Sequence, residues 1–129
     1  MHLRGTILVV DDDEAIRESL SDCLRDEGFE VVCARNGAEA LASLEAMESP
    51  IVILLDLMMP VMSGWEFLEV VQASDRLSAI PIIVVSAMCA PGARACIEKP
   101  VDLDRLLEAV HSLATPRPRS PTAQDAKTP

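Results

Sequence analysis

The chain has 129 residues, of which half are apolar and a quarter are charged, and its formal net charge at pH 7 is -10. This size and composition predict one globular domain with a sizeable core. The acidic balance argues against nucleic-acid binding, which needs a basic surface. No apolar run is long enough to span a bilayer, so we expect no membrane insertion.

The first residues reach the acidic run 11–14 before a secretory apolar region could form. We therefore expect a cytoplasmic protein without a signal peptide. The four cysteines show no Cys-x-x-Cys spacing, which favours free buried thiols in a reducing compartment. They are Cys23, Cys33, Cys89 and Cys96.

Short apolar runs bounded by turn residues predict strands that alternate with helices. The expected strands are 6–10, 29–34, 51–55, 80–85 and 95–98. The expected helices are 14–27, 38–47, 64–74 and a last segment that begins after Asp102. This alternation predicts an α/β fold with a doubly wound parallel sheet and helices on both faces.

Polar side chains follow four of the predicted strands, at the points where the strands end. They are Asp11 and Asp12, Asp56, Ser86 and Lys99. In an open parallel sheet these ends meet in one crevice, where ligands bind. Three clustered carboxylates repel one another unless a cation joins them, and hard oxygen ligands of this kind suit Mg²⁺. With a lysine and a hydroxyl to contact phosphoryl oxygens, Asp56 is a candidate nucleophile for phosphoryl transfer.

Four stretches of the chain together form a specific pattern: ILVVDDDEAIR at 7–17, IVILLDLMMPVMSGWEFL at 51–68, PIIVVSA at 81–87 and EKP at 98–100. With them, residues 6 to about 114 resemble the receiver domain of two-component response regulators. The resemblance implies a flavodoxin-like sheet of five strands in the order 2-1-3-4-5. We expect a receiver domain over 1–114, followed by a disordered Pro-rich tail or linker stub over 115–129.

The resemblance also implies a role for each strand-end residue. Asp56 would accept a phosphoryl group from a histidine kinase or a histidine phosphotransfer protein. Ser86 would be the switch hydroxyl, and Lys99 would contact the phosphate, with a cis peptide bond to Pro100 after it. The implied Mg²⁺ ligands are Asp11, Asp12, Asp56 and the backbone carbonyl of Met58. The protein would catalyse only its own phosphorylation and dephosphorylation, and would signal by binding an output protein or forming a homodimer.

The chain departs from the family between the fourth and fifth predicted strands. Only the nine residues 86–94 separate them, and a crossover that contains a helix needs at least about 10–12. The pair Pro91-Gly92 is a turn signal. We therefore expect the family's fourth helix to be missing or reduced to one turn. Cys96 also stands where the family normally has the aromatic residue of the switch.

Two other functions are compatible with parts of this pattern. The altered crossover is compatible with a pseudo-receiver, a phosphorylation-independent interaction module with the same fold. A phosphatase similar to the haloacid dehalogenases would also use a strand-end Asp as nucleophile. That class places a second Asp two residues later, where this chain has Met58. A phosphate shuttle or sink in a relay is a variant of the receiver function that sequence does not separate.

Overall fold

The computed structural model describes residues 5–86 and 95–114. Its centre is one sheet of five parallel strands in the order β2-β1-β3-β4-β5, as predicted. The strands are β1 Thr6–Val10, β2 Glu30–Ala34, β3 Val52–Leu55, β4 Ile82–Ser86 and β5 Ala95–Glu98. This is the doubly wound, flavodoxin-like order that the resemblance to receiver domains implies.

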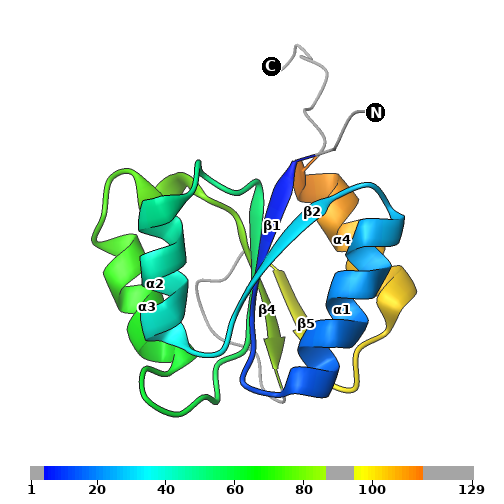
Figure 1. Ribbon diagram of the computed structural model, residues 1–129, viewed down its shortest axis with the longest axis horizontal. Helices are drawn as coiled ribbons and strands as arrows, with labels where there is room; N and C mark the ends of the chain where they lie inside the picture. The colour runs from blue at the N-terminus through cyan, green and yellow to red at the C-terminus, as the bar shows by residue number, and fades with distance from the viewer. Residues whose placement is uncertain (1–4, 87–94, 115–129) are drawn as a thin grey trace, which may run out of the picture.

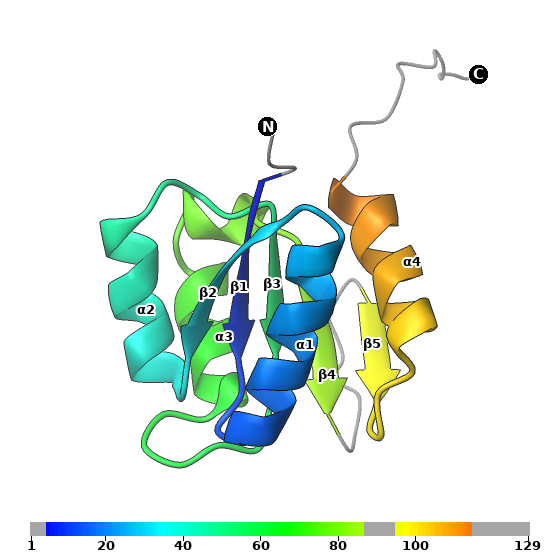
Figure 2. The same ribbon diagram turned by 45° about the vertical axis from the view of Figure 1, so that its right-hand side comes forward.

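Helices cover both faces of the sheet (Figure 1). Two of them, α2 (Gly37–Ala46) and α3 (Gly64–Gln72), pack on one face, and α1 (Glu14–Asp26) and α4 (Leu103–Ala114) pack on the other. A short 3-10 helix, η1 (Leu77–Ala79), precedes β4. The turned view in Figure 2 shows α1 in front of the sheet and α4 to the right, next to β5. Within the described residues, no helix has the length and apolar character needed to cross a membrane.

The core explains why the strand sequences lack the usual alternation of apolar and polar residues. Side chains of the inner strands point alternately to two clusters, one beneath α2 and α3 and one beneath α1 and α4. All four residues of β3 are therefore buried, as are all five of β4. In contrast, β2 lies at the edge of the sheet and is only partly buried. Continuous apolar runs are the signature of strands covered on both faces.

The segment that joins β4 to β5, residues 87–94, lies outside the described residues. Because Ser86 belongs to β4, the connection has eight residues and not nine. The four α-helices among the described residues fit a receiver whose fourth helix is missing or reduced. The helix labelled α4 here is the one that follows β5.

The cysteines differ from the expectation of four free buried thiols. Cys23 and Cys33 are free, but Cys33 is exposed, because its side chain lies on the edge strand β2. Cys96 on β5 is disulfide-bonded, so the prediction is wrong for this residue. Cys89 lies outside the described residues.

Candidate functional site

Strand register brings the acidic residues together at the carboxyl edge of the sheet. Val10 of β1 pairs with Leu55 of β3, so the residues that follow them, Asp11 and Asp56, emerge side by side. Carboxylate oxygens of Asp11, Asp12 and Asp56 lie within 4.8 Å of one another. The side chains of Asp11 and Asp56 are buried, whereas Asp12 is exposed. The cluster therefore has two fixed carboxylates at its base and one at its mouth.

Lys99 brings a positive charge to the same place from β5. Its Nζ lies 3.0 Å from Oδ2 of Asp11 and 3.6 Å from Oδ2 of Asp56. The backbone N–H of Lys99 donates to the carbonyl of Ser86, 3.1 Å away, which ties the end of β5 to the end of β4. The Lys99–Pro100 peptide bond is cis, as the resemblance implies.

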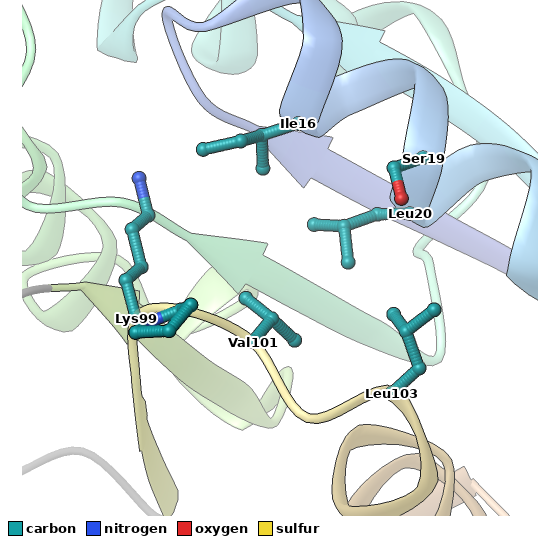
Figure 3. A pocket seen from close by; sticks show the side chains of 7 residues that line it. Ile16, Ser19, Leu20, Lys99, Val101 and Leu103 are labelled. Atoms are coloured by element: carbon teal, nitrogen blue, oxygen red, sulfur yellow. The ribbon is translucent and has the colours of Figure 1, made fainter.

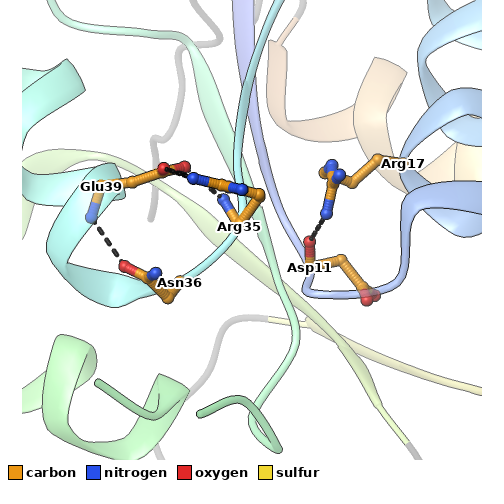
Figure 4. A network of polar contacts seen from close by, with 5 residues as sticks. All are labelled: Asp11, Arg17, Arg35, Asn36 and Glu39. Atoms are coloured by element: carbon orange, nitrogen blue, oxygen red, sulfur yellow. Dashed lines mark hydrogen bonds and ion pairs between the residues drawn. The ribbon is translucent and has the colours of Figure 1, made fainter. Parts of the chain in front are cut away.

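Asp11 is held at each of its polar groups. Its backbone N–H donates to the carbonyl of Ala34 at 3.1 Å, and its Oδ1 accepts the N–H of Asp13 at 2.9 Å. Its carbonyl accepts a hydrogen bond of 2.7 Å from Nη1 of Arg17 (Figure 4). Asp13 in turn caps α1, because its side chain accepts the N–H of Ile16. The first turn of α1 thus fixes the loop that presents the acidic pair.

Asp56 is anchored by the sheet and by the start of the next loop. Its N–H donates to the carbonyl of Val10 at 2.9 Å, and its Oδ1 accepts the N–H of Met58 at 3.2 Å. The loop then folds back so closely that α3 can begin only with a glycine. A Cβ on Gly64 would lie 2.3 Å from the carbonyl oxygen of Asp56 and 2.6 Å from Cα of Leu57, distances that backbone atoms do not permit.

The charges at the site do not balance among the protein groups alone. Burial raises the pKa of Asp56, the negative charge of Asp11 raises it further, and the Met58 N–H and Lys99 only partly oppose this. Burial lowers the pKa of Lys99, but its hydrogen bond to Asp11 and the two nearby carboxylates outweigh burial and raise the pKa overall. Lys99 is therefore charged at neutral pH. Three carboxylates against one ammonium leave an excess of negative charge, which suits a divalent cation.

Ser86 ends β4 at the same edge of the sheet. Its hydroxyl is fully buried and has no hydrogen-bond partner among the described residues. A buried hydroxyl without a partner costs about 1–3 kcal/mol. Such a group is commonly satisfied by a ligand, by a water molecule or in another conformation of the protein.

An apolar pocket of about 240 Å³ lies beside the carboxylates and is separate from them. Figure 3 shows Ile16, Ser19 and Leu20 of α1 facing Lys99, Val101 and Leu103 across it. The aliphatic stem of Lys99 forms part of its wall, while the ammonium group reaches the acidic cluster. The pocket is mainly apolar and adds no further ionisable group to the cluster.

The structure therefore brings together four of the residues singled out from the sequence, namely Asp11, Asp12, Asp56 and Lys99, and places Ser86 at the same edge. For Met58, the structure shows a hydrogen bond from the backbone N–H to Asp56, and the role of its carbonyl as a Mg²⁺ ligand, which the resemblance implies, stays a prediction. Sequence reasoning missed Arg17 and Asp13. An Asp directly before a helix is an N-cap signal, which could have identified Asp13.

A doubly wound parallel sheet with three carboxylates and a lysine at its carboxyl edge defines the class of α/β domains that carry an acidic strand-end site. The family model described as the response regulator receiver domain matches residues 7–111. The chain belongs to this family, which works in two-component systems. Receiver domains are generally signalling modules and not metabolic enzymes, and the family generally binds Mg²⁺ at its acidic pocket.

The most similar proteins include single receivers and longer regulators. The chain is 31% identical to the polar-differentiation response regulator DivK of Brucella anthropi over 116 residues, which are 83% of this chain and 94% of that protein. It is 39% identical over 85 residues to the DNA-binding response regulator MtrA of Mycolicibacterium smegmatis. That match covers 66% of this chain but only 36% of MtrA.

Solved structures show the same fold. The chemotaxis protein CheY4 of Vibrio cholerae superposes with a TM-score of 0.77 at 32% sequence identity, over 84% of this chain and 98% of that one. A response regulator receiver protein from Pseudomonas putida gives a TM-score of 0.79 at 32% identity, over 87% and 99% of the two chains.

Proposed function

We propose that this protein is a phosphoryl acceptor in a phosphorelay, with Asp56 as the acceptor and a histidine kinase or histidine phosphotransfer protein as the donor. The observation that carries the proposal is the cluster itself. Three carboxylates lie within 4.8 Å of one another, and Lys99 bridges Asp11 and Asp56. Protein groups that only stabilised the fold would not leave this excess of like charge at a sheet edge.

The donor set fits Mg²⁺, which prefers oxygen ligands. Asp11, Asp12 and Asp56 would hold the ion, together with the backbone carbonyl of Met58, and Asp11 would act through a water molecule. When bound, the cation would neutralise the carboxylates and polarise the phosphoryl oxygens. Asp12 at the exposed mouth and Asp56 at the buried base leave the entrance of the site open to the donor.

The chain's own residues account for the transfer step. One carboxylate oxygen of Asp56 attacks phosphorus, an O–P bond forms, and the P–N bond to the donor imidazole breaks with its electron pair staying on nitrogen. The Met58 N–H holds Oδ1 of Asp56, and Lys99 lies at Oδ2. Lys99 would form an ion pair with a phosphoryl oxygen, and the Ser86 hydroxyl, which has no partner among the described residues, would donate a hydrogen bond to another.

The proposed output is a change in affinity for a partner protein, made by a receiver domain over residues 1–114. Residues 115–129 would be a tail or linker. Cys96 and the eight-residue β4–β5 connection alter the surface that receivers of this family usually use for output. Signalling through a different surface, or through a homodimer, follows from this departure.

The test is the intact mass after incubation with acetyl phosphate or phosphoramidate and Mg²⁺. We expect a gain of one phosphate that is absent in Asp56→Asn and absent when EDTA removes the metal. A chain that binds Mg²⁺ but gains no phosphate from these donors or from a panel of phosphorylated histidine phosphotransfer proteins would instead be a pseudo-receiver. A gain that survives in Asp56→Asn would contradict the assignment of the acceptor.

A further inference from the structure

Arg17 connects the first turn of α1 to the loop that carries the acidic pair. Its Nη1 donates to the backbone carbonyl of Asp11 at 2.7 Å, across six residues of sequence and in a partly buried position (Figure 4). Hydrogen bonds from a charged donor at this length are about twice as strong as neutral ones. Asp11 lies before α1, so this contact is not one of the pairs three or four residues apart that any helix brings together.

The acceptor of this bond determines its effect. The carbonyl of Asp11 belongs to the peptide unit that joins Asp11 to Asp12, and this unit is planar. Holding its oxygen fixes the plane and therefore the direction in which the chain enters Asp12. The side chain of Asp11 is already fixed by Asp13 and Lys99. Arg17 thus restrains the backbone from which the exposed carboxylate of Asp12 projects.

Arg17 also carries a charge, and this charge would act against cation binding. The charge acts beyond its hydrogen bond: hydrogen bonds from Arg35 lower the pKa of Glu39 on α2 most, and the positive charge of Arg17 adds a smaller contribution in the same direction. By Coulomb's law alone, a guanidinium held at the backbone carbonyl of Asp11 weakens the affinity of the nearby carboxylates for a cation. Positioning and charge therefore have opposite effects on the affinity of the site for Mg²⁺.

We propose that Arg17 is a positioning residue for the cation site, and that its contribution to the geometry of Asp11 and Asp12 outweighs the repulsion of its charge. The inference rests on the proposed function in one respect only, namely that the cluster takes Mg²⁺. It assigns a role in the receiver site to a helix side chain that does not itself touch the ion.

Calorimetric titration with Mg²⁺ alone tests the inference on the unphosphorylated protein. We expect Arg17→Met to weaken Mg²⁺ binding by roughly tenfold, the size of effect seen when groups that orient metal ligands are removed. Arg17→Lys keeps the charge and one donor, and should recover part of the affinity. The matched control is Arg25→Met, which removes the same charge from an exposed position on the same helix, about 12 Å from Arg17. This variant should have a dissociation constant for Mg²⁺ within about twofold of wild type.

Urea unfolding in EDTA separates positioning from a general loss of stability, because a merely structural role would lower the unfolding free energy without changing the affinity of the folded fraction. If Arg17→Met does not fold, Arg17→Gln decides the question in the same way. Unchanged or tighter Mg²⁺ binding in a folded variant would overturn the inference, since the charge would then dominate. Absence of saturable Mg²⁺ binding in the wild type would instead overturn the proposed cation site.

Discussion

Replacement of Asp56 by Asn should make the metal-free protein more stable. At an effective dielectric constant of 20, a carboxylate 4.8 Å from Asp56, the largest separation in the cluster, repels it by about 3.5 kcal/mol. The ammonium of Lys99 at 3.6 Å attracts it by about 4.6 kcal/mol. The repulsion from the two other carboxylates exceeds the attraction to Lys99, so ionised Asp56 has a net unfavourable interaction energy of about 2 kcal/mol. Solvent at the exposed Asp12 reduces this energy to about 1–2 kcal/mol. The Asn side chain keeps an oxygen that can accept the Met58 N–H.

The gain should depend on pH in a defined direction. The folded-state pKa of Asp56 is raised above that of the unfolded chain by burial and by Asp11. Ionisation of Asp56 therefore destabilises the fold above the folded pKa and has no effect below about pH 4, the ordinary carboxyl value. The stability difference between Asp56→Asn and wild type should be small at pH 4 and should grow as the pH rises to 7.

Urea or thermal unfolding in EDTA measures this difference, with an expected rise in Tm of roughly 3–10 °C at pH 7. Addition of Mg²⁺ should reduce the advantage, since the cation stabilises the wild type through binding. The control is Asp75→Asn, the same chemical change at an exposed position outside the cluster, which should shift stability by less than about 0.5 kcal/mol. A metal-free Asp56→Asn protein less stable than wild type at pH 7 would refute the electrostatic reasoning.

Other positions give expectations that unfolding and phosphorylation assays can check. Val61 is 81% exposed and has a φ of 69°, a left-handed conformation that strains a residue with a Cβ. Val61→Gly should therefore raise the unfolding free energy by about 1 kcal/mol. The control Val70→Gly, inside α3, should lower it by a similar amount. Equal effects at the two positions would argue against strain at Val61. Gly64→Ala should lower stability by about 3 kcal/mol or prevent folding, because the new Cβ meets backbone atoms of Asp56 and Leu57; a variant of normal stability would mean that the loop can move aside. Ser86→Ala should leave metal-free stability unchanged or raise it by about 1 kcal/mol, because the hydroxyl has no partner among the described residues. The alanine variant should still gain phosphate, and loss of stability comparable to removing a made hydrogen bond would show a partner that we have not identified.

The fold could be predicted from sequence because its strongest signals are local. The uninterrupted run that contains β3 can be buried on both faces only in the middle of a parallel sheet. The turn and capping residues that divide the chain gave most element boundaries to within one or two residues. Phe29 shows the limit: it was predicted as strand, but it lies just before β2 and still packs in the core. The short helix η1 has no periodicity long enough to be recognised in sequence.

The candidate site was partly predictable for a related reason. Residues directly after parallel strands lie at the carboxyl edge whatever the details of packing, so Asp11, Asp56 and Lys99 were expected there from the strands that precede them. The order of those strands came from the family resemblance. The Arg17 contact, and the absence of a partner for the Ser86 hydroxyl among the described residues, depend on how loops and neighbouring strands pack, which no local sequence pattern indicates. The positive φ of Val61 was not predictable either, because glycine or asparagine indicates a left-handed backbone conformation and valine does not.

The parallel sheet separates the chemistry from the places where the described chain begins and ends. β1 starts and α4 finishes at the amino edge of the sheet, while the carboxylates lie at the opposite edge (Figure 2). A fluorophore, an affinity handle or a sensor surface attached beyond either of these elements would leave the entrance to Asp56 open. The protein is therefore suited to binding measurements in which it is immobilised by one end and donors approach from the other.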